Sequence, residues 1–405
     1  MCSRGFCGRV KMVSRVRIAG VGMSRFSMPR RSENYDVLAV EAITAALTDS
    51  GVELADIDQA YAGYVYGDST SGQNSLYQVG LPGVPVVNVN NNCSTGSTAL
   101  WLARQAVESG AARCVLAFGF EQMRPGALGT VWDDRPSPFD RFTAALDAVP
   151  GSDPGAPLAA RLFGGAGAAY AERYDTRPDL FARIAVKARR HAAANPNAVL
   201  RDPVTVEEVM AAPAVFGPLT RSQCCPPTCG AAAVLVCDAG FARERGLDAR
   251  VGVVAQSMTT DRPVSFEGDP IDLVGADMTR RAAARVYETA GIGPEDIPVV
   301  ELHDCFTTNE VLTYEALGLT GEGTAERFVL DGENTYGGRV VTNPSGGLLS
   351  KGHPLGASGL AQCAELVWQL EGRAGDRQVE GARVGLQHNI GLGGACVVTL
   401  YQRED

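Results

Sequence analysis

The sequence predicts an α/β protein made of two similar halves, and three observations support this fold class. Short apolar segments typical of buried strands alternate with segments of helical periodicity along most of the 405 residues, as in a mostly parallel sheet covered by helices on both faces. The order of these segments in the first half of the chain returns in the second half. The 47 glycines are scattered and form no low-complexity run, as expected where tight turns and close helix–strand contacts are frequent.

The first half begins with a buried strand at 16–23 (VRIAGVGM), which is bounded by glycine. The Ala-rich segment 35–50 has apolar residues at helical spacing and ends at Gly51, a typical helix-terminating residue. The remaining elements expected in this half are strands at 57–66, 85–89 and 113–120 and a helix at 94–109.

The second half is expected to repeat this order. Its predicted elements are strands at 251–257, 299–303, 383–388 and 395–401 and helices at 273–290, 309–317 and 355–370. Residues 49–57 also align without gaps on residues 289–297, with Gly, Asp and Ile coinciding in each stretch. Because the element order agrees as well, we interpret the two halves as a duplication.

The strand pattern is interrupted between the halves. The segment 122–218 is rich in Pro, Gly and Ala, with helical periodicity near 159–174 and 180–194, and is expected to be an inserted loop domain that caps a site. The predicted organisation is a flexible lead-in at 1–15, an N-terminal half at 16–121 and 219–250, this insertion, and a C-terminal half at 251–405.

Composition excludes several classes of function. The net charge of −10 argues against a nucleic-acid surface, which needs clustered Lys and Arg. No apolar stretch approaches the roughly 20 residues of a membrane span, so no membrane insertion is expected. The odd count of eleven cysteines indicates reduced thiols and a cytoplasmic protein. Cys224, Cys225 and Cys229 have no second Cys/His pair at metal-binding spacing, so no metal is expected. The pair Gly393-Gly394 is not a dinucleotide fingerprint.

Cys93 is the first candidate for chemistry. It lies where the strand at 85–89 passes through three asparagines into the helix at 94–109. A thiol at a helix N-terminus is partly stabilised as the thiolate by the helix dipole and by free N–H groups. The alternative is a buried, inert cysteine of the α/β core, and this segment alone leaves both interpretations open.

The histidines favour the catalytic interpretation. Of the four in the chain, His303, His353 and His388 lie in turns at predicted strand ends or helix starts. Ligands of open α/β sheets bind at the carboxyl ends of strands, so these side chains can converge. His191 lies in a charged helix and is expected to be solvated.

Four sequence blocks together resemble the thiolase superfamily, in the form of the sterol-carrier-protein-x type. The blocks are NNNCSTGS (90–97), HDCF (303–306), NPSGGLLSKGHPLGASG (343–359) and QHNIGLGGA (387–395). They occur in the family's order, and the resemblance extends from about residue 16 to 402. It implies the thiolase fold, with mixed sheets in an α-β-α-β-α arrangement.

The resemblance implies a nucleophile and two proton-transfer groups. Cys93 accepts the acyl group, while His353 lowers its pKa and takes its proton. In the sterol-carrier type, Cys305 of the HDCF block is the acid/base thiol. This agrees with the chemistry, because removing a proton next to a thioester requires a base close to the carbon that the nucleophile holds.

It also implies two oxyanion holes. His303 and His353 stabilise the enolate, directly or through water. Backbone N–H groups of Cys93 and near Ile390 and Gly391 stabilise the oxyanion of the acyl thioester.

The sequence departs from most thiolases at two places. The family commonly has Asn-Glu-Ala-Phe where this chain has the HDCF block, and a second catalytic cysteine where this chain has His388-Asn389. These two residues are expected to orient substrate. Asp304 and Glu310 either orient catalytic groups or cap the adjacent helix.

The implied activity is acyl transfer between coenzyme A thioesters in lipid metabolism, such as the thiolysis of fatty acid β-oxidation or the reverse Claisen condensation. Coenzyme A is then a co-substrate that binds the insertion 122–218, no cofactor is tightly bound, and the chain pairs as a homodimer through its N-terminal half. One alternative is a thiolase-like carbon–carbon lyase on steroid or lipid thioesters, against which Cys93 argues. Another is a non-catalytic acyl- or lipid-binding protein, which the lack of an appended lipid-carrier domain makes less favourable.

Overall fold

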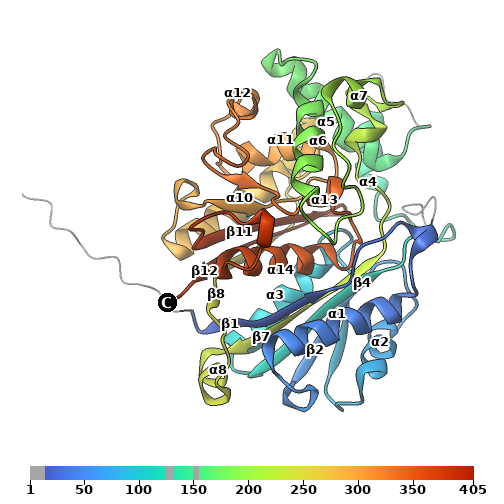
Figure 1. The fold of residues 1–405 in the computed structure, drawn as a ribbon. Helices are drawn as coiled ribbons and strands as arrows, with labels where there is room; N and C mark the ends of the chain where they lie inside the picture. The colour runs from blue at the N-terminus through green and yellow to red at the C-terminus, as the bar shows by residue number, and fades with distance from the viewer. Residues whose placement is uncertain (1–13, 125–131, 149–154) are drawn as a thin grey trace, which may run out of the picture.

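The computed structural model describes residues 14–124, 132–148 and 155–405. Most of the predicted lead-in at 1–15 lies outside the described residues. Among the residues that are described, no helix is long and apolar enough to cross a membrane. Figure 1 shows the N-terminal half at the bottom of the molecule and the C-terminal half above it.

In the described part of the chain, the first half contributes five strands to the main sheet, in the order β3-β2-β4-β7-β1. β2 pairs in parallel with β3 and β4, whereas β7 pairs antiparallel with β4 and β1, so this half of the sheet is mixed. The bounds are β1 (Val16–Met23), β2 (Gln59–Gly63), β3 (Val86–Val89), β4 (Cys114–Glu121) and β7 (Gly230–Asp238).

The second half repeats the order and the directions, as β10-β9-β11-β12-β8. β9 is parallel to β10 and β11, and β12 is antiparallel to β11 and β8. The bounds are β8 (Val251–Thr259), β9 (Val299–Glu301), β10 (Val341–Thr342), β11 (Val384–Gly391) and β12 (Ala395–Arg403). The predicted α/β class with two similar halves is therefore confirmed.

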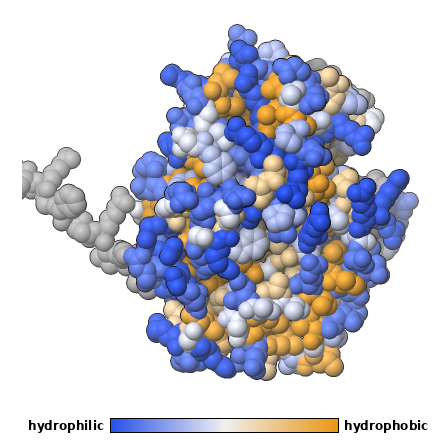
Figure 2. All heavy atoms as spheres, in the orientation of Figure 1, coloured by the Kyte–Doolittle hydropathy of each residue, from blue (hydrophilic) through white to orange (hydrophobic). Residues whose placement is uncertain are grey.

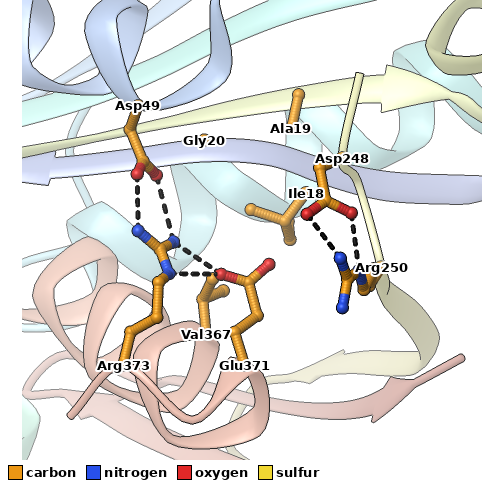
Figure 3. Close-up of a pocket in the computed structure, with 9 residues that line it drawn as sticks. All are labelled: Ile18, Ala19, Gly20, Asp49, Asp248, Arg250, Val367, Glu371 and Arg373. Atoms are coloured by element: carbon orange, nitrogen blue, oxygen red, sulfur yellow. Dashed lines mark hydrogen bonds and ion pairs between the residues drawn. The ribbon is translucent and has the colours of Figure 1, made fainter. Parts of the chain in front are cut away.

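The two half-sheets are joined edge to edge, a feature that the sequence did not predict. Arg17 of β1 pairs with Gly252 of β8, and Ile18 pairs with Val251, after which the strands separate. A notch opens where they part (Figure 3), and Asp49 and Arg373 form an ion pair across it at 2.7 Å. The notch thus lies at the boundary between the two halves. The exposed ion pair across it contributes little to the stability of the fold.

Helices form three layers around the two half-sheets. α3 (Thr95–Glu108) and α14 (Ser358–Glu371) pack together in the centre, in one apolar cluster with the inner strand faces of both halves. α1 (Tyr35–Ser50) covers the outer face of the first half, and α10 (Ala276–Ala290) covers that of the second. The predicted α-β-α-β-α arrangement is visible in Figure 1.

The insertion contains α4 (Asp140–Asp147), α5 (Leu158–Tyr174), α6 (Leu180–Ala192), α7 (Val206–Ala211) and β5 (Ala214–Phe216). α5 and α6 pack on α11 (Thr307–Ala316) of the second half. Lys187 of α6 is buried and forms an ion pair with Glu310 of α11, and its Nζ lies 2.6 Å from Thr342 Oγ1. Glu310 therefore binds the insertion, which a role as a helix cap would not explain.

Two local expectations differ from the structure. His191 is buried, not solvated: its Nδ1 lies 3.0 Å from the Asn343 carbonyl and its Nε2 lies 2.8 Å from Thr335 Oγ1. Its helix is covered by a loop of the second half, which local periodicity cannot reveal. Strand β7 was not predicted because its alanines favour helix by propensity, whereas β1 and β4 pair with it on both sides.

Candidate active site

Cys93, His303 and His353 converge at one point. The Cys93 sulfur and one ring nitrogen from each histidine all lie within 4.8 Å of one another. Cys93 lies between β3 and α3, His303 follows β9, and His353 lies between α13 (Gly347–Ser350) and α14. The site is thus assembled from both halves at strand ends and helix starts. Zinc accepts such ligands, but a thiol beside two imidazoles is also the arrangement of a nucleophile with its base.

The conformation of Cys93 is set by the residue before it. Asn92 has a left-handed backbone with φ of 52°, and its amide nitrogen donates to the Leu392 carbonyl at 3.2 Å. The Cys93 thiol lies 3.5 Å from Asn92 Oδ1 and donates to it. Asparagine tolerates this backbone better than most residues. Through its bond to Leu392, Asn92 ties the Cys93 loop to the second half.

Burial, with the nearby carboxyl of Glu121, raises the pKa of the Cys93 thiol to about 12. The backbone N–H groups of Cys93 and Leu392 favour the thiolate but do not prevail. The Cys93 side chain is therefore a thiol, in contrast to the thiolate expected from its place before a helix. A base must remove the proton when the sulfur attacks.

His353 has the properties of that base. Its Nδ1 lies 2.6 Å from Ser358 Oγ, while its Nε2 is buried and has no hydrogen-bond partner in the described part of the chain. Burial and the charge of Lys351 lower the pKa of His353 to about 3, so the ring is neutral. The His303 and His353 rings meet edge to face, with centroids 5.2 Å apart.

The site residues predicted on β11 play different parts. Asn389 Nδ2 lies 3.0 Å from His303 Nδ1, which places Asn389 against the cluster. His388 does not reach it: His388 Nε2 lies 3.0 Å from Thr279 Oγ1, and its Nδ1 accepts from the backbone N–H of His303 at 3.4 Å. His388 therefore supports the loop that carries His303.

Ile390 and Gly391 bring the end of β11 against the nucleophile loop. Ile390 is buried in the apolar core. A Cβ on Gly391 would lie 2.1 Å from the Asn91 carbonyl, so only glycine permits this approach. Besides the N–H of Cys93 itself, the backbone N–H that favours the Cys93 thiolate belongs to Leu392, immediately after the predicted pair.

A third thiol, missed from the sequence, lies beside the predicted pair. Cys305 is buried, and burial with the neighbouring thiols Cys225 and Cys93 raises its pKa well above the usual range. The backbone N–H of Cys225 donates to the Cys305 carbonyl at 2.9 Å. Cys225 was considered only as part of a metal motif, and no local signal links it to the HDCF block.

Two buried carboxyls organise the loops. Asp304 accepts from the backbone N–H of Leu348 at 2.7 Å, so it connects the HDCF block to α13, just before His353. Burial and the charge of Glu310 raise the pKa of Asp304 to about 8. Glu121, which sequence reasoning also missed, ends β4 and accepts from Gly356 at 3.1 Å, which ties the loop after His353 to the first half.

Comparisons with known proteins agree with this geometry. The family model for the thiolase N-terminal domain matches residues 12–240, and that for the thiolase C-terminal domain-like family matches residues 268–401. Sterol carrier protein 2 of Rattus norvegicus is 52% identical over 96% of this chain and 72% of that protein. The acetyl-CoA acetyltransferase of Methanothermobacter thermautotrophicus is 35% identical over 96% of this chain and 99% of that protein.

Solved structures share the fold. The Ltp2-ChsH2(DUF35) aldolase superposes with a TM-score of 0.81 at 23% identity, covering 96% of this chain and 98% of the other. Human mitochondrial 3-ketoacyl-CoA thiolase gives 0.71 at 18% identity, covering 97% and 99%. Both family models match in order, and about half of the residues are identical to those of a relative aligned over 96% of this chain. The chain therefore belongs to the thiolase family and is an acyl-CoA C-acyltransferase.

Proposed function

We propose that the enzyme cleaves 3-oxoacyl-CoA with coenzyme A, or runs the reverse condensation, through an acyl group on Cys93. The observation that carries this proposal is that neutral His353 belongs to the cluster with the protonated Cys93, while its buried Nε2 has no hydrogen-bond partner in the described chain. A neutral imidazole that lacks a partner can take the thiol proton without first losing one of its own.

In the cleavage direction, His353 takes the proton of Cys93 and the sulfur attacks the 3-oxo carbon. The bond between C2 and C3 breaks, the acyl group stays on sulfur, and the electron pair leaves as the enolate of the shorter thioester. Cys305, which its raised pKa keeps as a thiol, protonates C2. The Cys305 thiolate then takes the proton of coenzyme A, whose sulfur attacks the acyl-enzyme. Cys93 leaves as the thiolate and regains its proton from His353.

Two sets of donors serve the two oxyanions in this proposal. His303 donates to the enolate oxygen. The backbone N–H groups of Cys93 and Leu392, which already interact with the Cys93 sulfur, donate to the tetrahedral oxyanion on the acyl carbon.

The test is intact mass after incubation with acetyl-CoA. The wild-type chain should gain one acetyl group and Cys93→Ala none. Cys114→Ala removes a buried thiol of β4 and is the matched control, which should acetylate normally. An adduct that persists in Cys93→Ala would contradict the proposal.

A carbon–carbon lyase is the second candidate, because the aldolase named above shares the fold. The lyase reaction needs no second thiol substrate, whereas thiolysis stops without coenzyme A. Cleavage of 3-oxoacyl-CoA that proceeds at full rate without free coenzyme A would therefore favour the lyase. The sterol carrier relatives support lipid-derived thioesters as the substrate class.

We also propose that residues 122–218 bind coenzyme A as a co-substrate and that no cofactor is held tightly. Phe163 of α5 stacks on Phe306 of the HDCF block with centroids 5.0 Å apart, and Thr308 Oγ1 donates to the Phe163 carbonyl at 2.9 Å. The insertion thus contacts the catalytic loop. Coenzyme A should slow amide hydrogen exchange in α5 and α6, and an unchanged exchange rate throughout 122–218 would refute this assignment.

The nine cysteines in the described part of the chain are all free thiols. This supports a reducing compartment, and we propose the cytoplasm.

A further inference from the structure

Asn389 of β11 contacts His303, one of the three residues that converge in the cluster of Cys93, His303 and His353. Both side chains are buried, and Asn389 Nδ2 lies 3.0 Å from His303 Nδ1. An amide nitrogen only donates, so Nδ1 accepts and carries no proton. Burial, with the neighbouring imidazoles, lowers the pKa of His303 well below its usual range. The ring is therefore neutral, and its one proton is on Nε2.

The orientation of the Asn389 amide supports this assignment. Its Oδ1 is buried without a partner among the described residues. If the Asn389 amide were flipped, its Oδ1 would face His303 Nδ1 and accept a hydrogen bond from it. The two N–H groups of the amide would then no longer have His303 Nδ1 as an acceptor. Buried N–H groups without a partner are rarer than carbonyls with spare acceptor capacity, so the observed orientation costs less.

His353 has the opposite tautomer for an equally local reason. Its Nδ1 lies 2.6 Å from Ser358 Oγ, and the Ser358 hydroxyl donates its own proton to the Pro354 carbonyl at 2.8 Å. Ser358 Oγ must then accept from His353, so the proton is on Nδ1 and the lone pair on Nε2. Two adjacent neutral imidazoles thus present a donor and an acceptor.

We propose that Asn389 is a positioning residue that holds His303 as the Nε2–H tautomer, so that His303 donates to the enolate oxygen while His353 exchanges protons with Cys93. The inference rests on the proposed function and adds the group that separates the two histidine roles. His303 Nε2 forms no hydrogen bond within the described chain, which leaves it for the substrate. Without Asn389, the proton of His303 could move to Nδ1, and the donor would be lost.

The tautomer can be measured directly. The chain has four histidines, so imidazole ¹⁵N–¹H correlation spectra of the full-length protein at neutral pH can be assigned by single substitution. His303 is expected to show the Nε2–H pattern. In Asn389→Asp, the carboxylate accepts instead and should place a proton on Nδ1. An Nδ1–H pattern for His303 in the wild type would overturn the proposal without any need for a variant.

Kinetics provide the second test. Transfer of acetyl from acetyl-CoA to Cys93 forms no enolate, so Asn389→Asp should leave the rate of this step within about threefold of wild type. Thiolysis of acetoacetyl-CoA does form an enolate, and its rate should fall about 10²- to 10³-fold, as when one oxyanion donor is lost. Asn389→Ala removes the donor without adding a charge and should lower thiolysis less. Equal losses in both reactions, or no loss in thiolysis, would overturn the inference.

A matched control is available on β8. Gln256 donates from Nε2 to Thr399 Oγ1 at 2.9 Å, so Gln256→Glu makes the same amide-to-acid change elsewhere in the second half. It should leave both reactions and the His303 tautomer unchanged. If wild-type Cys93 takes up no acetyl group, the proposed function fails, whereas normal acetylation with unimpaired thiolysis in Asn389→Asp refutes only the role of Asn389.

Discussion

The two thiols to which we assign catalytic roles, Cys93 and Cys305, differ in what surrounds them. Cys93 has an asparagine amide, a neutral imidazole and two backbone N–H groups at its sulfur. Cys305 is buried among other thiols, with no nearby cation among the causes that shift its pKa. A thiol with a base and oxyanion donors suits nucleophilic attack, and a thiol held in its protonated form suits proton transfer to carbon.

Replacing Cys305 should separate the two half-reactions. Cys305→Ala is expected to accept acetyl on Cys93 as wild type does but to lose thiolysis by roughly a hundredfold or more, the usual cost of a lost general acid/base. Intact mass and steady-state rates measure the two effects, with Cys363→Ala of α14 as a buried-thiol control. A near-normal thiolysis rate in Cys305→Ala would show that another group acts as the general acid/base. The neighbouring thiol of Cys225 would then be the next candidate.

Glu121 should make stability depend on pH. Burial outweighs three backbone N–H donors and raises its pKa from 4.5 to about 7. Its pKa is higher in the folded state than in the unfolded state. The carboxyl therefore makes its full contribution to the free energy of unfolding below pH 4.5, and this contribution is lost as the pH rises through about 7. Glu121→Gln lacks this titration, so the stability of wild type relative to the variant should decline across that window, by up to about 1.4 kcal/mol per pH unit.

Urea unfolding at several pH values between 4.5 and 8 measures the difference. The variant also loses acceptor capacity toward Val65, Tyr66 and Gly356, which adds a constant cost. A difference that stays constant over the whole range would show that the carboxyl titrates at its ordinary pKa.

At the scale of elements, the loop that carries His353 is packed against the strands of the other half. A Cβ on Gly119 of β4 would lie 2.0 Å from the Gly356 carbonyl, and a Cβ on Gly356 would lie 2.5 Å from the Gly63 carbonyl. The loop after His353 therefore lies directly on the ends of β2 and β4. Glycine is needed here for close approach, and the contact holds the loop after His353 against the half that carries Cys93.

Gly119→Ala should disturb activity through that contact. The added methyl must displace the loop at Gly356, which we expect to cost about 1–3 kcal/mol of stability and to lower kcat by about 10²-fold, because the base moves relative to Cys93. Gly165→Ala in α5 is the control, since a Cβ there meets nothing within 4 Å. Wild-type kcat in Gly119→Ala would show that the loop adjusts without moving His353.

For the whole molecule, the exposed surface near the sheet edge favours pairing. β3 is an edge strand, and three large apolar side chains on or near it are exposed: Tyr77 by 50%, Leu81 by 78% and Val87 by 46%. Figure 2 shows apolar surface gathered over the lower end of the molecule, where the N-terminal half lies. An uncovered apolar edge strand invites aggregation unless something pairs with it, so we predict that a second copy of the chain covers this edge.

Sedimentation should find a homodimer at micromolar concentration. Leu81→Asp is expected to raise the dimer dissociation constant tenfold or more, which is about 1.4 kcal/mol, and Leu330→Asp is the control because Leu330 is an exposed leucine, 42% accessible, in the other half. A monomeric wild type, or equal effects of the two variants, would contradict the predicted interface.

The sequence by itself determined the class of the fold and named the candidates for the catalytic groups. Periodicity placed β1 and α1 at their observed bounds, because their apolar spacing is a local property of strand and helix. Four motif blocks predict Cys93, His303, Cys305 and His353 as catalytic candidates, and three of these side chains converge within 4.8 Å. Residue type and spacing suffice to name such candidates, because the chemistry requires particular side chains.

The tertiary structure decided the protonation state of Cys93 and the contacts that Cys225 and His388 make around the site. Cys93 is a thiol and not the expected thiolate, because burial and Glu121, which is far from Cys93 in sequence, outweigh the local N–H groups. Cys225 enters the site through a contact with Cys305, and His388 is turned away by Thr279. Charge state and hydrogen-bond partner depend on what lies nearby in space, and only folding brings together groups that are far apart along the chain.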